Sequence, residues 1–405
     1  MTFSRTKRGL ASFIILGADA GCGPSHLAEP DIEVVVHARI PLDRALEQQP
    51  AVLVRSAESA GAFFVAALGG DRVFLVHANG SWSVAVPPES LLRVSSLGVQ
   101  EDFLWVADDA ARRVLLVGGT TARRREILTP TIQPHVLPHV VGPLSNDAFV
   151  VASRPERSQG DTLVSLISIM SESEAVVIDS AVEIGGELRV GTPGGDAFVT
   201  RQPWFYHDVP LINRSSRTLT ILRQRPGRSN DVAAIVEVHE SRGSRGGAVA
   251  QELSLRPIAL TDAAVAAWLK FMMQDSLVSL LGGRRRADSV LRTALYRPGT
   301  LPAIRRAISA STETLLLERV TADSSHHWEV WQAGKHNGSF VLDPWISLQD
   351  AADSTIWAVT RRATGIDSIL VATLRERAHP RRARRTASPT RSADDGERLV
   401  LRTGR

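Results

Sequence analysis

A unit of two apolar strands recurs along this chain, and a recurring unit limits the possible folds more than any single motif. Each copy has an acidic or small turn, an apolar strand, a polar turn and a second apolar strand. The copies begin at Ala60, Glu101, Asn146, Gly195, Ser311 and Asp353. Most begin about 40 to 50 residues after the previous copy, which suits a four-stranded antiparallel sheet with its turns. The spacing predicts an all-β protein built from six similar sheets.

The second copy, EDFLWVADDAARRVLLVGG, places the charged stretch DDAARR (Asp108 to Arg113) between two apolar runs. Aspartate side chains accept backbone N–H bonds in turns, and we expect the arginines to project into water. A catalytic carboxylate would need a base or a metal ligand beside it, and the neighbouring sequence offers neither. We therefore interpret DDAARR as the turn between two strands of one sheet.

Two Asn-Gly pairs mark further turns. They occur in VHANGSWSV (Asn79-Gly80) and in GKHNGSFVL (Asn337-Gly338), each time between β-prone runs. Asn and Gly both tolerate positive φ, which the tight type I′ turn requires. The sequence predicts a hairpin turn at each pair.

The interval between the fourth and fifth copies is longer than the others and changes its period. Two β-like runs, DVAAIVEVHE and AVAQELSLRPIAL, come first. Thr261-Asp262 is then a helix N-cap signal, and apolar residues follow at helical spacing up to Gly282-Gly283. Their shared face, which we expect to pack against the sheet, comprises Val265, Trp268, Leu269, Met272 and Leu280. With a second short helix over 287–295, the pattern predicts a helical insertion over residues 262–296.

The repeats, with LGVQEDFLWVADDAARRVLLV as the clearest copy, resemble the six-bladed β-propeller family with NHL-like repeats. In that family a glycine-rich turn precedes an L-W-V-A-D strand and an R-V-x-V strand. The stretches RPGTLPAIRRAISASTETLLLERV, HHWEVWQAGKHNGSFVL and DSTIWAVTRR are similar to the closing part of bacterial exported propellers. Those proteins are often lipoproteins of unassigned function. The resemblance covers residues 31–377 and implies a six-bladed β-propeller with a helical insertion.

The two ends of this region bear on how a propeller would close. Propellers usually pair strands from both termini in one blade, and radial blades leave only short protected edges. IEVVVHARI (Ile32–Ile40) is a suitable partner for the last blade, which ends at SILVATLRE. We therefore predict closure through residues 32–40. Residues 378–405 hold eight arginines and lack apolar periodicity, which predicts a disordered basic tail.

The first thirty residues have the architecture of an export signal. Arg5, Lys7 and Arg8 precede an apolar run, 10–18, that is too short to span a bilayer. Small residues then lead to Cys22, the single cysteine of the chain. We interpret residues 1–21 as a signal peptide and residues 22–30 as a linker.

Cys22 directly follows Ala20-Gly21, which resembles a bacterial lipobox, although Asp19 stands where that motif has an aliphatic residue. The resemblance implies lipidation of Cys22 and an extracytoplasmic protein that meets a membrane only through its lipid anchor. The segment Ala18-Asp19-Ala20 also fits ordinary signal peptidase, which would leave a soluble periplasmic or secreted protein. A chance cysteine is the third alternative.

The charge distribution argues against a nucleic-acid partner. The net charge of +4 arises from the two termini, and the region between them is mildly acidic. We interpret two arginine triplets, Arg123–Arg125 and Arg284–Arg286, as solvated loop charge.

Few residues point to a chemical site. The sequence has no Gly-x-Ser-x-Gly, Walker A, Gly-x-Gly-x-x-Gly or His-Glu-x-x-His motif, so we assign no catalytic, cofactor-binding or metal-ligating residue. The histidine clusters, which we expect to be structural or exposed, are His135 with His139, and His326 with His327 and Glu329. A third stretch, PWFYHDV, offers Trp204, Tyr206, His207 and Asp208 as a candidate binding surface in a loop.

These observations favour a non-enzymatic binding or scaffold module. We expect a monomeric rigid ring that presents loops to a protein, glycan or other cell-envelope ligand and needs no cofactor. A propeller-type hydrolase or lyase with an active site at the channel mouth is the alternative, because distant blades can bring together residues that no spacing reveals. A structural or assembly role is a third possibility.

Overall fold

The structure is a computed structural model. The structure describes residues 31–42, 46, 52–56, 62–77, 79–100, 103–118, 124–128, 136–145, 148–155, 162–171, 174–184, 186–213, 216–224, 234–241, 248–321, 325–362 and 365–377. The predicted signal peptide, the linker with Cys22, and the predicted tail 378–405 lie outside these residues. No helix in the described ranges is long and apolar enough to cross a membrane.

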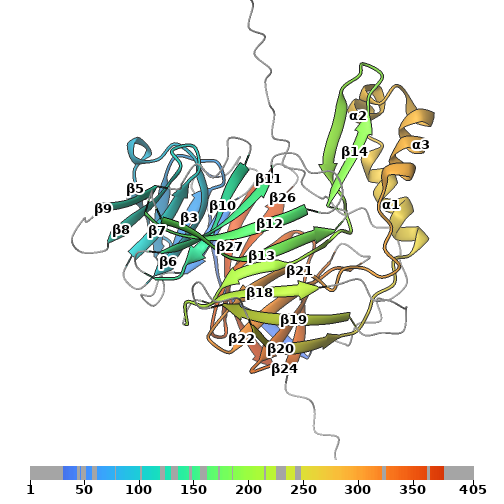
Figure 1. The fold of residues 1–405 in the computed structure, drawn as a ribbon. Helices are drawn as coiled ribbons and strands as arrows, with labels where there is room; N and C mark the ends of the chain where they lie inside the picture. The colour runs from blue at the N-terminus through green and yellow to red at the C-terminus, as the bar shows by residue number, and fades with distance from the viewer. Residues whose placement is uncertain are drawn as a thin grey trace, which may run out of the picture.

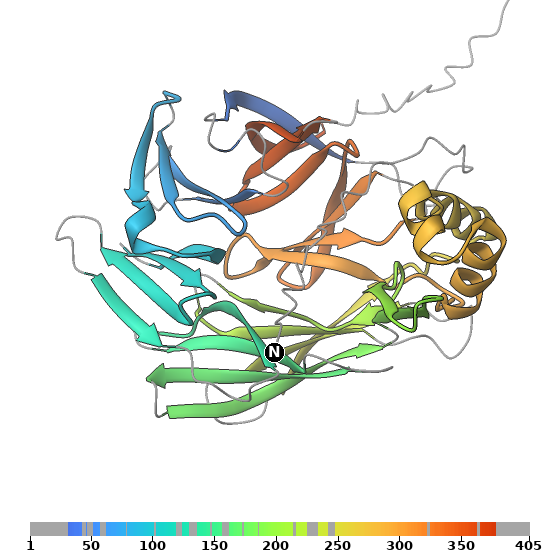
Figure 2. The ribbon, with the colours of Figure 1, turned by 90° about the horizontal axis from the view of Figure 1, so that it is seen from above.

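The described strands form a six-bladed β-propeller, as predicted, in which each blade is an antiparallel sheet with its first strand innermost (Figures 1 and 2). Blade one comprises β2 (Val52–Ser56), β3 (Ala62–Ala67), β4 (Val73–His77) and β5 (Trp82–Val86). Blade two comprises β6 (Val94–Gln100), β7 (Phe103–Asp108), β8 (Arg113–Gly118) and β9 (Arg124–Leu128). Blade three comprises β10 (Val136–Pro143), β11 (Phe149–Pro155), β12 (Thr162–Ser171), β13 (Glu174–Ile184) and the short β16 (Tyr206–His207).

The second half of the ring continues in chain order. Blade four comprises β17 (Val209–Ile212), β18 (Leu219–Gln224), β19 (Ala234–Ser241) and β20 (Ala248–Leu255). Blade five comprises β21 (Ile304–Ser309), β22 (Thr314–Arg319), β23 (His326–Gln332) and β24 (Lys335–Leu342). Blade six comprises β25 (Ile346–Ala352), β26 (Thr355–Arg362), β27 (Gly365–Glu376) and β1 (Ile32–Pro41). A short 3-10 helix, Pro88–Ser90, connects blades one and two.

The hydrophobic core is divided among the six spaces between neighbouring blades. In β7, Trp105 and Ala107 pack toward blade three, whereas Leu104 and Val106 pack toward blade one. Corresponding clusters join every other pair of neighbours, including blades six and one. Both faces of each sheet are therefore buried. This explains why the strands are continuous apolar runs instead of alternating apolar and polar residues.

β1 closes the ring. It pairs antiparallel with β27 from Ile32 opposite Glu376 to Pro41 opposite Ser368. The prediction that residues 32–40 complete the last blade is confirmed. β1 also contacts blade five, because the Ser339 backbone N–H donates to Asp31 Oδ1 at 2.6 Å.

The DDAARR stretch is the turn between β7 and β8, as predicted. Asp108 is fully buried, and its carboxylate accepts the backbone N–H groups of Leu92 (2.9 Å), Arg93 (3.0 Å) and Ala111 (3.2 Å). This one side chain therefore fixes both the turn and the chain that enters β6. Of the two arginines expected in water, Arg112 is exposed. Arg113 is not, because it pairs with Glu126 at 2.7 Å and lies 3.5 Å from Asp108.

Only one of the two Asn-Gly predictions is correct. The turn at Asn79-Gly80 joins β4 to β5, and the Gly80 N–H donates to the His77 carbonyl at 2.8 Å. In blade five the turn is Ala333-Gly334, where φ is 43° and 78°. Gly338 lies inside β24, where a Cβ would come within 2.7 Å of Asp31 Oδ1. Because Gly338 has no side chain, β1 can lie close to blade five, so this glycine is needed for the close approach of β1 and not for a turn.

The fourth repeat was assigned incorrectly. Its first strand, β15 (Ala197–Arg201), pairs with β14 (Glu187–Gly191) in a separate two-stranded sheet outside the ring. Side chains along β15 alternate between exposed and half-buried, so one face meets solvent. A strand inside a blade has both faces covered, and AFVTR does not supply that pattern. Blade four instead uses the two β-like runs of the following interval as β19 and β20.

The predicted helical insertion is confirmed as α1 (Asp262–Met272), α2 (Asp275–Leu280) and α3 (Arg284–Ala294), which lie outside the ring (Figure 2). Thr261 caps α1, because its side chain accepts the Ala264 N–H at 3.2 Å. The helices pack on the β14–β15 hairpin around Leu188 and Trp204, and not on a blade as predicted. Leu280, expected on the packed face, is 49% exposed. We call the hairpin and the three helices the insertion lobe.

Candidate functional site

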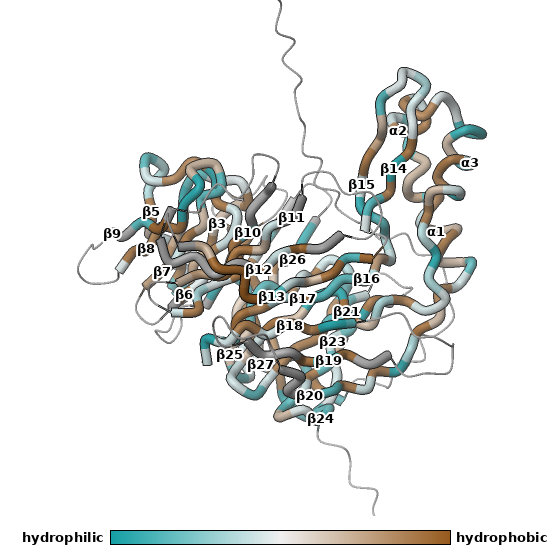
Figure 3. The backbone as a smooth tube through the Cα atoms, in the orientation of Figure 1, coloured by the Kyte–Doolittle hydropathy of each residue, from teal (hydrophilic) through white to brown (hydrophobic). Residues whose placement is uncertain are grey.

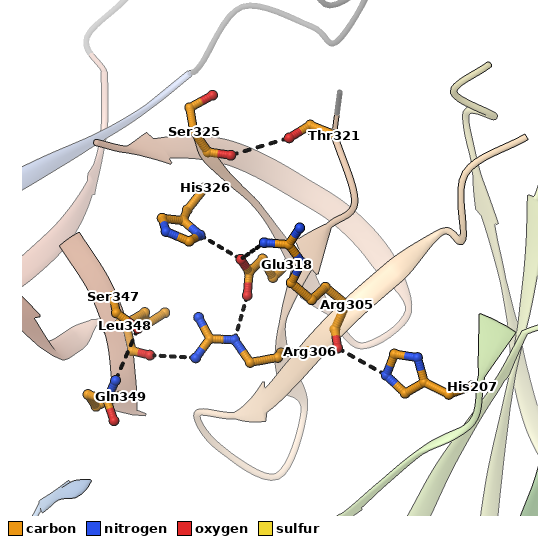
Figure 4. A network of polar contacts seen from close by, with 10 residues as sticks. All are labelled: His207, Arg305, Arg306, Glu318, Thr321, Ser325, His326, Ser347, Leu348 and Gln349. Atoms are coloured by element: carbon orange, nitrogen blue, oxygen red, sulfur yellow. Dashed lines mark hydrogen bonds and ion pairs between the residues drawn. The ribbon is translucent and has the colours of Figure 1, made fainter. Parts of the chain in front are cut away.

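Charged side chains gather at one end of blade five. Arg305 and Arg306 begin the innermost strand β21, Glu318 lies near the end of β22, and His326 begins β23. Neighbouring strands are antiparallel, so these positions meet at the same end of the sheet (Figure 4). We call Arg305, Arg306, Glu318 and His326 the blade-five network.

Glu318 is the centre of this network and is only 1% exposed. Its carboxylate accepts Arg306 Nε at 2.5 Å and lies 2.7 Å from His326 Nδ1 and 3.7 Å from Arg305 Nη1. Burial alone would raise the pKa of this carboxyl. The charge of Arg306, the hydrogen bond of His326 and the charge of Arg305 outweigh burial and lower the pKa to about 2. Glu318 is therefore ionised throughout the physiological pH range.

Arg306 also connects blade five to blade six. Its Nη1 donates to the Leu348 carbonyl at 3.2 Å, and its guanidinium lies 5.4 Å from the ring centre of Trp328. The side chains of Arg305 and Arg306 remain 41% and 39% exposed. Both side chains therefore hold the buried carboxylate while part of each remains exposed.

Arg361, near the end of β26, adds a further positive charge. Burial and the charge of Arg306 both lower the pKa of Arg361. Its Nε is buried and has no hydrogen-bond partner among the described residues. Arg305 and Arg306 thus share the carboxylate of Glu318, and Arg361 adds a third positive charge that interacts with Arg306.

A second ion pair lies on the opposite face of blade five, toward blade four. Arg319 is 2% exposed, pairs with Glu329, and donates to the carbonyls of Ala303 (2.9 Å) and Arg256 (2.6 Å). Glu329 also accepts Trp331 Nε1 at 2.9 Å. These groups are satisfied by buried protein partners, so this pair holds the chain that enters β21 in place.

The predicted binding surface at PWFYHDV is not an exposed aromatic patch. Trp204 is buried in the insertion lobe, and the buried Tyr206 donates to the Thr300 carbonyl at 2.9 Å. The buried carboxylate of Asp208 accepts the Val182 N–H at 2.9 Å. His207, whose pKa is lowered by burial, lies with Nε2 3.1 Å from the Arg305 carbonyl. The stretch therefore connects the insertion lobe to the ring, and His207 contacts the backbone of the blade-five network at Arg305.

The histidine clusters are only partly described. His135 lies outside the described residues, and His139 is exposed on β10. His327 Nε2 lies 2.9 Å from the Ser325 hydroxyl. The described residues contain no group of three or more His, Cys, Asp or Glu placed to hold a metal ion.

Of the blade-five network, the sequence singled out only His326, in a cluster expected to be structural or exposed, and did not identify Arg305, Arg306 or Glu318. One signal was present: in TLLLERV, Glu318 interrupts an apolar run of the kind that forms a buried strand. A charge inside such a run requires a buried partner. The partner could not be read from spacing, because a β-bulge between Ile304 and Arg306 determines that Arg306 lies opposite Glu318.

Comparisons with known proteins find only distant structural similarity. No protein-family model and no curated protein sequence matches the chain. A member of the DUF4221 family from Bacteroides vulgatus is 7% identical with a TM-score of 0.44, over 86% of this chain and 100% of that one. A putative exported protein from Bacteroides fragilis is 10% identical (TM-score 0.40, 85% and 95%). Virginiamycin B lyase from Staphylococcus aureus, in complex with quinupristin, is 10% identical (TM-score 0.39, 85% and 100%).

Proposed function

We propose that this protein is a binding module of the cell envelope, and that its ring binds an anionic, carboxylate-bearing ligand beside the blade-five network. The observation that carries the proposal is the charge balance at this end of blades five and six. Two arginines, each about 40% exposed, share the buried carboxylate of Glu318, and the charge of Arg306 is also felt by a third, Arg361. Guanidinium groups match carboxylates geometrically and form strong charge-assisted hydrogen bonds with them.

The protonation state of Glu318 supports binding over proton transfer. A general acid or base works best when its pKa lies near the operating pH. Glu318, with a pKa of about 2, stays ionised and acts as a fixed charge that orients Arg305 and Arg306. Fixed and preorganised charges lower the cost of ordering side chains when a ligand binds.

The cellular location is part of the same proposal. The basic start, the short apolar run and the small residues before Cys22 support export and lipid anchoring at Cys22. The mass of the N-terminal peptide of the mature protein tests this. A chain that begins at Gly21 with an unmodified cysteine would indicate ordinary secretion instead.

Calorimetric titration tests the anion-binding proposal. The probes are an oligomer of galacturonate and a neutral maltooligosaccharide of equal length. We expect the uronate alone to bind, with an affinity that falls as salt rises. Arg305→Gln should raise its Kd about tenfold, because it removes a charged hydrogen bond but leaves Arg306 and His326 on Glu318. Arg361→Gln should act in the same direction.

Arg39→Gln is the matched control, because Arg39 is an exposed arginine on β1. Equal affinity for the neutral and charged probes, or an unchanged Kd in both network variants, would contradict the proposal.

The second candidate function is that of a hydrolase or lyase, and one contact favours it. The His326 ring is held by the Glu318 carboxylate at 2.7 Å, as an orienting group would hold a general base. Cleavage of the uronate during the titration would identify that activity.

A further inference from the structure

The insertion lobe has one end that lies away from the ring (Figure 1). At the end near the ring, Gln202 Nε2 donates to the Ala294 carbonyl, the last residue of α3, at 2.9 Å. α3 has 11 residues and is therefore about 16 Å long, which places Arg284 at the opposite end. The turn of the β14–β15 hairpin reaches the same end. A Cβ at Gly282 would lie 2.8 Å from Pro193 Cγ and 3.4 Å from Arg286 Cδ. We call this part the distal end.

The distal end has an apolar groove. It has a volume of about 160 Å³ and is lined by Phe198, Phe271, Met272, Gln274, Ser276, Leu277 and Leu280. At its rim Leu280 is 49% exposed. Figure 3 shows hydrophobic stretches along β15 and near α2. A cavity of about 150 Å³ accommodates a benzene molecule, so this groove has room for a segment of hydrocarbon chain of similar volume.

Three exposed arginines follow the groove in the chain. The first turn of α3 consists of Arg284, Arg285 and Arg286, and this turn contains no acidic residue. Positive charge at the first turn of a helix opposes the helix dipole, and three adjacent guanidinium groups repel one another. The helix dipole and the mutual repulsion of these charges therefore do not favour three arginines at this place.

We propose that the distal end docks on a membrane surface rich in anionic lipid. Headgroup phosphates meet Arg284–Arg286, while Leu280 enters the interface and a hydrocarbon chain fills the groove. Arginines beside exposed apolar side chains are the combination that binds an anionic membrane interface. Each of the three arginines strengthens such binding about fivefold. A gain of this size makes the docking of the lobe on the membrane weak and reversible. The lobe would then orient the ring on the surface. This inference does not depend on the proposed ligand of the ring.

A probe at the distal end tests the proposal in the full chain. Leu280→Cys, made together with Cys22→Ser so that it is the single cysteine, carries an environment-sensitive fluorophore. The vesicles are phosphatidylcholine alone or phosphatidylcholine with about one-third phosphatidylglycerol. We expect a blue shift only with the anionic vesicles, and its loss at high salt. The same label at Lys335→Cys, in the exposed β23–β24 hairpin, should not shift. The local label is needed because the arginine-rich segment 378–405 can itself attract anionic vesicles.

The arginines are tested by adding Arg284→Gln, Arg285→Gln and Arg286→Gln to the labelled chain. The expected result is a roughly hundredfold weaker vesicle affinity, with a melting temperature that does not fall, because all three side chains are exposed and their charges oppose the dipole of α3. The matched control neutralises three exposed charges on the ring, namely Arg39→Gln, Arg112→Gln and Lys335→Gln.

Three outcomes would overturn the proposal. They are an equal shift with neutral vesicles, an unchanged affinity in the Arg284–Arg286 variant, and a shift that depends on protein concentration without vesicles. The last outcome would assign the groove to a second copy of the chain.

Discussion

A chain that begins at residue 43 is expected to lose most of the stability of the ring, because it lacks the strand that closes blade six. β1 contributes the buried side chains of Ile32 and Ile40 to the cores on the two sides of that blade. Each fully buried isoleucine contributes about 1.5–3 kcal/mol, so the two together are comparable with the net stability of many domains. The loss also exposes the backbone edge of β27, which would favour aggregation.

Urea denaturation of three chains tests this expectation. The reference chain spans residues 31–405, the first variant begins at residue 43, and the second ends at residue 377. We expect a greatly lowered midpoint or insolubility when β1 is missing. The tail truncation should change the midpoint little, since residues 378–405 offer no apolar periodicity to bury. Equal effects of the two truncations would contradict closure by β1.

Glu318→Gln should destabilise the protein by about 3 kcal/mol at pH 7. The substitution keeps the shape of the side chain but leaves Arg306, Arg305 and His326 without their negative partner. The pKa of Glu318 is about 2 in the folded protein, against 4.5 for an unperturbed glutamate. A folded-state pKa below the unfolded value stabilises the protein fully above pH 4.5, and that contribution disappears as pH falls toward 2. Wild type and variant should therefore converge in acid.

Urea denaturation of both proteins at pH 7 and near pH 3 measures this convergence. Glu126→Gln is the matched control, because Glu126 forms a 2.7 Å ion pair with Arg113 but its side chain is 48% exposed. An exposed pair of this kind contributes less than about 1 kcal/mol. A Glu318→Gln protein as stable as wild type at pH 7 would contradict the account, and so would a deficit that persists undiminished in acid.

The sequence predicted those parts of the fold that local patterns determine. The paired apolar runs predicted the second and third strands of five blades, because both faces of each blade are buried and the runs are nearly unbroken. DDAARR predicted a turn, because an aspartate at a strand end can bind the backbone N–H groups around it. The change of period predicted the helices. In each of these cases neighbours in the chain supply the deciding interaction.

The wrong predictions concern patterns that tertiary contacts override. AFVTR reads as a strand, but its alternating exposure shows that it needed cover on one face only, which the helices of the insertion lobe provide. Asn337-Gly338 reads as a turn, but Gly338 is required where β1 passes next to blade five. The aromatic residues of PWFYHDV were expected in a loop, and the lobe buries Trp204. None of these partners is close in sequence.

The candidate site could be predicted even less completely. A glutamate within TLLLERV indicates a buried charge, yet its partners come from the two neighbouring strands, β21 and β23. Arg306 lies opposite Glu318 only because the register shifts at a bulge. Arg361 comes from the next blade and is recognisable only through its burial and its repulsion by Arg306. The residues of this site are brought together by the register of the strands and by a neighbouring blade. Their spacing in the sequence therefore does not reveal the site.

Hydrogen exchange tests the central claim, a six-bladed ring closed by its N-terminal strand, most directly. The measurement compares backbone amide protection in the peptides that cover β1 and β27 of the intact protein. If β1 closes blade six, its paired amides should exchange as slowly as those of β27, because they open only when the ring opens. Rapid exchange throughout residues 32–41 beside a protected β27 would mean that the strand is not part of the ring, and the account would be wrong.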